Sequence, residues 1–204
     1  MKVIPINSFE VEPWLLQKHY AKRMCPISYD FGLYVDEHLV GVVTYGVPAS
    51  PFLCMGICGS DYKDKVLELN RLCLNDGVKN GASFLVSKSL KMLPKPTIVV
   101  SYADTAMGHV GYIYQASNFL FTGTTKERTD MAGEDGKHSR HNFGISEIRI
   151  NRSAKHRYVY FVGSKNQKNS LLKQLNYEVL PYPKGETQRY DAGTTVKTQQ
   201  LLFV

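Results

Sequence analysis

The chain has 204 residues, 43% hydrophobic and 21% charged, a composition typical of a soluble globular domain with one full core. No stretch approaches the roughly 20 apolar residues of a membrane helix. The N-terminus lacks the charged and apolar regions of a signal peptide, so we expect a cytoplasmic protein, monomeric or homodimeric.

The net charge of +7 is concentrated in the C-terminal part. Residues 1–124 hold 11 Lys and Arg against 10 Asp and Glu, a net of +1, whereas residues 125–204 hold 14 against 8, a net of +6. Lys and Arg contacts to phosphates supply most sequence-independent affinity for nucleic acids, so this part is a candidate polyanion-binding surface. A solvated basic face explains the charge equally well.

Four cysteines are present, and their spacing fits neither a disulfide framework nor a zinc finger. We expect them to be buried, reduced thiols. They are Cys25, Cys54, Cys58 and Cys73.

Apolar periodicity and turn residues divide the first half of the chain into strands and helices. In chain order these are an edge strand at 3–6, a helix at 11–23 with Pro13 in its first turn, a hairpin of strands 31–35 and 39–45, a strand at 66–74, a helix at 82–93 and a buried strand at 97–102. The run 52–57, set among Pro and Gly, predicts no definite element.

The second half begins with a small-residue turn after Asp104, then a helical stretch that carries His109, Tyr112 and Tyr114. The remaining predictions are a strand at 119–122, a long polar loop at 124–142, strands at 148–150 and 157–162, a short helix at 170–175 and a turn-rich segment at 181–191. This order predicts an α/β fold built on a mixed sheet with helices on both faces.

Asp104 and Tyr114 form the first candidate site. Asp104 follows a predicted central strand, at the edge where open α/β sheets place ligand crevices, and Tyr114 lies ten residues later on the next predicted helix. A carboxylate there can take a proton from an attacking amine, and a phenol can give one to a leaving group. Each residue also has a structural interpretation, Asp104 as a helix N-cap and Tyr114 as a half-buried core aromatic.

Four further polar residues are candidates for substrate binding. His109 and Tyr112 are three residues apart, so one helix face would carry both, and a neutral imidazole can act as a base or a metal ligand. Asn70 and Arg71 lie inside a strand, where polar side chains need partners. Arg71 could pair with Asp104, bind a substrate phosphate or carboxylate, or form a structural ion pair.

The segment 101–118, with Ser-Tyr-Ala-Asp followed by Gly-His-Val-Gly-Tyr-Ile-Tyr-Gln-Ala, resembles the phage Mom family of DNA-adenine-modifying proteins. The resemblance spans about residues 15–191. It implies a single GNAT-like (N-acetyltransferase-like) domain over 1–204, with a twisted mixed sheet, an acyltransferase-like core at 1–124 and a basic C-terminal part at 125–204 that completes the sheet and faces DNA.

The resemblance also implies a set of site residues. Asp104 and Tyr114 are the expected catalytic pair, and Ser101 and Tyr102 extend the catalytic set. The expected substrate-binding residues, with the four named above, are His19, Tyr45, Lys184, Arg189 and Tyr190.

Mom-like proteins convert adenines in phage DNA to N6-(carbamoylmethyl)adenine, which protects the genome against host restriction. The implied partner is double-stranded DNA with the target adenine turned out of the stack. The added group contains two carbons and a nitrogen, so an activated glycine such as glycyl-tRNA is the expected donor. Acetyl-CoA is a doubtful donor because residues 78–83 keep only Gly81 and Ala82 of the GNAT pyrophosphate-binding turn. An iron-assisted route exists for the family, but no set of metal ligands stands out.

Two other functions stay open from the sequence. One is a CoA-dependent N-acetyltransferase that acts on a small amine or a protein. The other is a non-catalytic DNA-binding module on the same fold.

Overall fold

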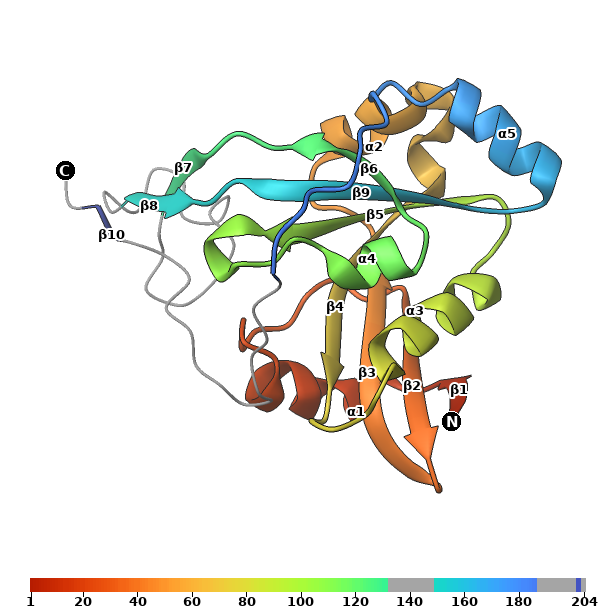
Figure 1. The fold of residues 1–204 in the computed structure, drawn as a ribbon, viewed down its shortest axis with the longest axis vertical. Coiled ribbons are helices and arrows are strands. Elements are labelled where there is room, and N and C mark those ends of the chain that lie inside the picture. Colours follow the sequence, from red (N-terminus) through yellow and green to blue (C-terminus); the bar gives the residue numbers. More distant parts are fainter. Residues whose placement is uncertain (132–148, 187–200, 203–204) are drawn as a thin grey trace.

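The computed structural model describes residues 1–131, 149–186 and 201–202. Its main element is a seven-stranded mixed sheet in the order β1-β2-β3-β4-β5-β9-β6 (Figure 1). Neighbouring strands are antiparallel except for the central β4 and β5, which are parallel. The strands are β1 (Lys2–Pro5), β2 (Tyr29–Val35), β3 (His38–Gly46), β4 (Val66–Leu74), β5 (Thr97–Asp104), β6 (Leu120–Thr124) and β9 (Lys155–Val162).

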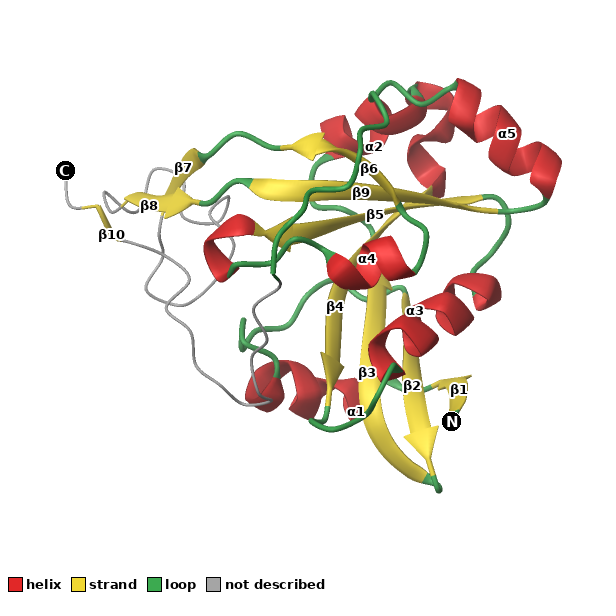
Figure 2. Cartoon of the chain, in the orientation of Figure 1, coloured by secondary structure: helices red, strands yellow, loops and turns green. Residues whose placement is uncertain are grey.

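A second, small sheet extends the main one in the order β10-β8-β7. Its strands are β7 (Arg128–Met131), β8 (Arg149–Arg152) and β10 (Leu201–Leu202). Strands β7 and β8 prolong β6 and β9 beyond the main sheet, on the left of Figure 2. The backbone N–H of Thr125 donates to the Lys155 carbonyl (2.9 Å) and the Lys155 N–H to the Thr125 hydroxyl (3.0 Å), which fixes the junction.

Helices cover both faces of the main sheet, as the sequence predicts. They are α1 (Ser8–Pro13), α2 (Pro51–Cys58), α3 (Gly81–Met92), α4 (Tyr112–Ala116) and α5 (Lys165–Lys173), with the π-helix η1 (Trp14–Lys18) and the 3₁₀ turns η2 (Ser60–Lys65) and η3 (Thr105–Met107). Helices α3 and α4 pack on one face, and α1, α2 and α5 on the other.

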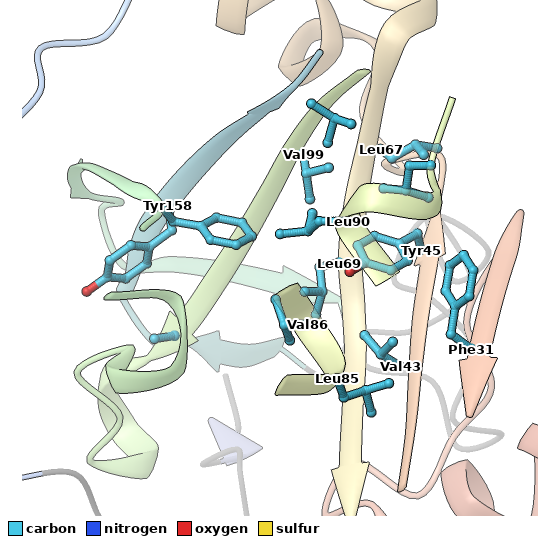
Figure 3. Packing of buried hydrophobic residues seen from close by; sticks show 14 of the residues in the cluster. Phe31, Val43, Tyr45, Leu67, Leu69, Leu85, Val86, Leu90, Val99 and Tyr158 are labelled. Carbon is cyan, nitrogen blue, oxygen red and sulfur yellow. The ribbon is translucent and has the colours of Figure 1, made fainter. Parts of the chain in front are cut away.

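Side-chain alternation along the strands separates the two cores. On β5, Val99 packs under α3 whereas Ile98 and Val100 pack under α2 and α5. Figure 3 shows the larger core, in which Tyr45 and Phe31 lie beside side chains of α3. The mixed α/β class predicted from the sequence is confirmed by this arrangement.

The first helix differs from the prediction. It begins at Ser8 rather than at residue 11, because Asn7 and Glu10 form a capping box with the Asn7 N–H donating to Glu10 (3.0 Å). Pro13 therefore ends α1 instead of lying in its first turn. The chain continues as the π-helix η1, consistent with the missing N–H of Pro13, and stops at His19, which has extended backbone.

Other differences are local. The unassigned run 52–57 belongs to α2, which Ser50 caps and Pro51 begins. The predicted loop at 124–142 contains β7, and its residues 132–142 lie outside the described chain. The C-terminal helix begins at Lys165 instead of residue 170 because Ser164 and Gln167 form a second capping box. No helix in the described residues is long and apolar enough to cross a membrane.

Candidate active site

The two central strands separate partway along their length. Strands β4 and β5 pair only over Val66↔Ile98, Leu67↔Val99 and Glu68↔Val100. One further contact follows, in which the Ser101 hydroxyl donates to the Leu69 carbonyl (2.9 Å). Beyond it the strands diverge (Figure 1), so side chains from both faces of the sheet can meet between them.

A β-bulge in β4 determines which side chains point toward α1 and α2. Thr44 of β3 pairs with Arg71 while its neighbour Tyr45 pairs with Leu69, so Asn70 is the extra residue. Arg71 therefore lies on the face that carries Glu68. The Asn70 amide donates to the Pro26 carbonyl (2.7 Å), and its oxygen accepts from Thr44 (2.5 Å). Asn70 thus fastens the segment that follows His19 to the sheet.

Asp104 ends β5 and is held by three donors. Its carboxylate accepts hydrogen bonds from Ser153 (2.5 Å), the Ala106 N–H (3.1 Å) and Lys155, which also forms an ion pair with it. Burial alone would raise the pKa of Asp104, but the bonds from Lys155 and Ser153 lower it overall. The site therefore holds a fixed, ionised carboxylate. Of the roles left open for Arg71, pairing with Asp104 is not the one adopted in the described residues, where Lys155 forms that ion pair.

A second group of side chains comes from the segment after η1. His19 is buried, stacks on Tyr20 with ring centroids 4.4 Å apart, and accepts a hydrogen bond from the Ala21 N–H at Nδ1 (3.0 Å). Tyr20 meets His109 edge-on at 6.1 Å. Burial, followed by the charges of Arg71 and Arg23, lowers the pKa of His19 to about 3. His19 is therefore neutral at physiological pH.

The low pKa of His19 makes stability depend on pH. In the unfolded chain His19 is protonated below about pH 6.5, whereas in the folded chain it is protonated only below about pH 3. Between these pH values the unfolded state binds the extra proton, so the free energy of unfolding that His19 contributes at pH 7 is lost as the pH falls. From pH 7 to pH 5 this group should reduce the free energy of unfolding by about 2 kcal/mol. Urea unfolding at both pH values should show a smaller loss in His19→Asn. The control His38→Asn, at the exposed start of β3, should retain the wild-type loss. An unchanged loss in His19→Asn would contradict the prediction.

Arg71 provides a hydrogen-bond donor, its Nε–H, that has no partner among the described residues of the site. Its Nη1 donates to the Asn70 carbonyl (2.7 Å), but its buried Nε has no partner in the described residues. Burial raises the pKa of the neighbouring Glu68, and the charges of Arg71 and Lys155 partly offset that rise. A buried guanidinium N–H without an acceptor is costly, so Arg71 is suited to bind an oxygen of a substrate.

Tyr114 reaches the divergence from the opposite face. Its ring packs against Phe119 and Tyr158, with centroids 5.5 and 5.3 Å apart. Burial raises its pKa to about 12, although a hydrogen bond with Ser101 opposes the rise. Tyr20 and Glu68 raise it further, so these groups from the other face lie close to the phenol. The phenol is therefore protonated at neutral pH.

His109 and Tyr112 do not share a helix face as predicted. Gly108 and Gly111 adopt left-handed backbone (φ 63° and 78°), which delays the helix until Tyr112. His109 lies in the loop between them and faces Tyr20, whereas the Tyr112 side chain is 59% exposed. Only His109 joins the site.

Tyr45 and Tyr102 lie away from the point where the other residues meet. Tyr45 is fully buried, and its hydroxyl is bonded to Ser89 (2.7 Å) beneath α3, so it supports the core. Tyr102 packs on the α2 and α5 face, where burial raises its pKa. Lys184 is exposed in the C-terminal segment. Arg189 and Tyr190 lie outside the described residues.

Sequence reasoning missed Ser153 and Lys155. They follow β8 about 50 positions after Asp104, and only the antiparallel pairing of β5 with β9, which sets Asp104 opposite Lys155, brings them together. The predicted strand began at residue 157, whereas β9 begins at Lys155. A prediction that included Lys155 would have extended the pairing of β9 with β5 as far as Asp104.

No three His, Cys, Asp or Glu side chains come close enough to share a metal ion within residues 1–131 and 149–186. The iron-assisted route thus lacks a ligand set in this part of the chain.

Comparison with known proteins identifies the family. The model of the Mom protein family matches residues 1–184. The chain belongs to the Mom family. It is 27% identical over 206 residues to the methylcarbamoylase Mom of Escherichia phage Mu, covering 90% of this chain and 84% of that protein. Membership of the Mom family agrees with the resemblance read from residues 101–118, and makes the protein a transferase.

Solved structures also resemble this Mom family member. The ribosomal-protein-alanine N-acetyltransferase of Brucella melitensis has a TM-score of 0.48 and 8% identity, covering 79% of this chain and 99% of that one. The N-acetyltransferase of Staphylococcus aureus Mu50 has a TM-score of 0.41 and 14% identity, covering 66% and 67%.

Proposed function

We propose that this Mom family member modifies DNA, converting adenine in duplex DNA to N6-(carbamoylmethyl)adenine and so protecting phage DNA from restriction. The observation that carries the proposal is that an ionised carboxylate, Asp104, and a protonated phenol, Tyr114, lie on two sides of one aromatic pair. Asp104 acts electrostatically on His109, His109 packs edge-on against Tyr20, and Tyr20 in turn raises the pKa of Tyr114. The 27% identity to a methylcarbamoylase supports the group transferred.

The donor in this proposal is glycyl-tRNA. Adenine N6 attacks the glycyl ester carbonyl, an N6–C bond forms, and the C–O bond to the tRNA breaks to release its hydroxyl. The freed glycyl amine then attacks C6 through a five-membered intermediate, and the original N6 leaves C6 to become the carboxamide nitrogen. The second stage is an isomerisation, so the sum is one glycyl unit transferred and one tRNA released.

Each stage has a residue suited to it. The adenine nitrogen becomes strongly acidic once it has attacked the carbonyl, so Asp104 can accept its proton despite a lowered pKa. Tyr114, with a pKa of about 12, keeps the proton that the departing oxygen needs. The free Arg71 Nε–H is suited to the carbonyl oxygen as negative charge develops.

The loop before α3 argues against the acetyl-CoA alternative. A pyrophosphate is usually held by backbone N–H groups at such a helix start. Here the Gly81 N–H donates to the Val78 carbonyl (3.1 Å), and an added Cβ on Gly81 would lie 2.6 Å from the Val78 side chain. That N–H is already used, which supports a different donor.

The test is to incubate the purified protein with duplex DNA and tRNA charged with ¹³C,¹⁵N-glycine, and to analyse the nucleosides by mass spectrometry. We expect deoxyadenosine heavier by one labelled glycyl unit, with the ¹⁵N attached to C6. Hydrolysis of the carboxamide should therefore release unlabelled ammonia. Labelled ammonia would refute the rearrangement, and DNA without label would refute the donor.

The same experiment separates the alternatives. An acetylated product with acetyl-CoA in place of charged tRNA would indicate an N-acetyltransferase. DNA binding without any covalent product under either condition would indicate a binding module.

A further inference from the structure

Strands β7 and β8 form a ribbon that projects beyond the main sheet beside the candidate site. Their register pairs Arg128 with Arg152, Thr129 with Asn151 and Asp130 with Ile150. Alternation therefore gives the ribbon two distinct faces, each supplied by both strands.

The side chains of the inner face contact one another and are largely buried. Arg152 forms an ion pair with Asp130 (2.8 Å), both side chains are only 17% exposed, and Ile150 is buried. Arg152 also contributes to lowering the pKa of Arg23, so this face lies close to the segment that carries His19. The Arg152–Asp130 ion pair joins the two strands of the ribbon to each other, and their inner face is the one turned toward the site.

The outer face carries exposed polar side chains for which the described part of the chain provides no hydrogen-bond or ion-pair partner. Thr129 and Asn151 lie directly across from each other, and Arg149 follows on the same face of β8. Hydroxyl, amide and guanidinium groups are the ones that read base edges in duplex DNA. Over 128–131 and 149–152 the ribbon has three Arg and one Asp, a net charge of +2, which favours a polyanion.

The dimensions of the ribbon fit the DNA major groove. Paired strands lie about 4.8 Å apart, and the major groove, about 12 Å wide, admits a two-stranded ribbon. Among the residues that the structure describes, β10 adds pairs only at Arg149 and Ile150, so two strands are described at the Thr129–Asn151 pair. The described part of the ribbon is therefore narrow enough for the groove where its polar pair projects.

The ribbon is also close to the reacting groups. Asn151 is two residues from Ser153, whose hydroxyl donates to Asp104 (2.5 Å). Two strand residues span about 7 Å, or about two base steps at 3.4 Å each. If the target adenine lies at Asp104, the base pairs one or two steps away in the duplex therefore lie next to the outer face of the ribbon.

We propose that the outer face of the β7–β8 ribbon lies in the major groove and reads the bases that flank the target adenine. The inference rests on the proposed function for its target. It assigns sequence-context specificity to Asn151 and Arg149, which take no part in the chemistry.

The test maps modified adenines in a duplex library with randomised flanks. Asn151→Ala should lose discrimination at one flanking position by about fivefold or more, whereas Asn166→Ala, exposed on α5, should retain the wild-type pattern. Wild-type context preference that is absent, or unchanged in both Asn151→Ala and Arg149→Ala, would overturn the proposal.

A second measurement does not depend on catalysis. Methylation of guanine N7, which lies in the major groove, should interfere with binding of the full chain to duplex DNA. Arg149→Ala should remove interference at one guanine, while Lys173→Ala on α5 should not. Interference that is identical in all three proteins would refute the groove contact. Loss of modified adenine in the wild type, with interference intact, would instead refute the proposed function alone.

Discussion

Asp104→Asn is expected to reduce formation of modified adenine by about 100-fold or more. The amide keeps the size of the side chain but cannot accept a proton from adenine N6, and general acid–base groups contribute roughly 10²–10⁴. Substrate binding should change little, because the carboxylate already faces Lys155 and Ser153. The measurement is the initial rate of nucleoside modification at saturating DNA.

Asp61→Asn, on the exposed turn η2, is the matched control and should retain the wild-type rate. Lys155→Met separates charge from folding. Because Lys155 lowers the pKa of Asp104, its removal should raise that pKa and move the acidic limb of the pH–rate profile to higher pH. Full activity in Asp104→Asn, or an unmoved limb in Lys155→Met, would exclude Asp104 as proton acceptor.

Gly111→Ala is expected to lower both activity and stability, the latter by about 2–4 kcal/mol. Gly111 has φ 78°, and an added Cβ would lie 2.4 Å from the Tyr158 ring. Tyr158 cannot retreat easily, since its hydroxyl donates to the Val110 carbonyl (2.5 Å) and accepts from Gln115 (3.1 Å). The turn that carries His109 and Tyr114 must then shift. Urea unfolding and the modification rate measure the two effects.

Gly77→Ala isolates the backbone contribution. Gly77 has nearly the same φ, 79°, but an added Cβ meets nothing within 4 Å. This variant should lose about 1–2 kcal/mol and keep its activity. Equal stability losses in Gly77→Ala and Gly111→Ala would show that the contact with Tyr158 has no cost.

Helices and strands were predictable where the apolar periodicity ends at a turn residue or a proline. Strand β4 has the predicted bounds because its apolar alternation ends at a turn, and α3 ends before Pro94 as expected. The start of α1 was misplaced because its first turn is polar. There the Asn7–Glu10 capping box outweighs the apolar pattern that begins at Val11.

The candidate site was predictable only in its local parts. Asp104, Tyr114 and His19 stand out by residue type or by resemblance. The partner of Asp104 did not, because pairing across some 50 positions depends on sheet order. The bulge at Asn70, which turns Arg71 to the face of Glu68, leaves no mark in the apolar pattern.

The position of β9 between β5 and β6 bears on how the chain can be divided. A fragment that ends near residue 124 would contain β5 and β6 without the strand that pairs with both. Each would then present a row of unpaired N–H and C=O groups, which is a template for aggregation. Split versions of this enzyme should therefore be cut elsewhere, with β9 kept on the piece that holds its two neighbours.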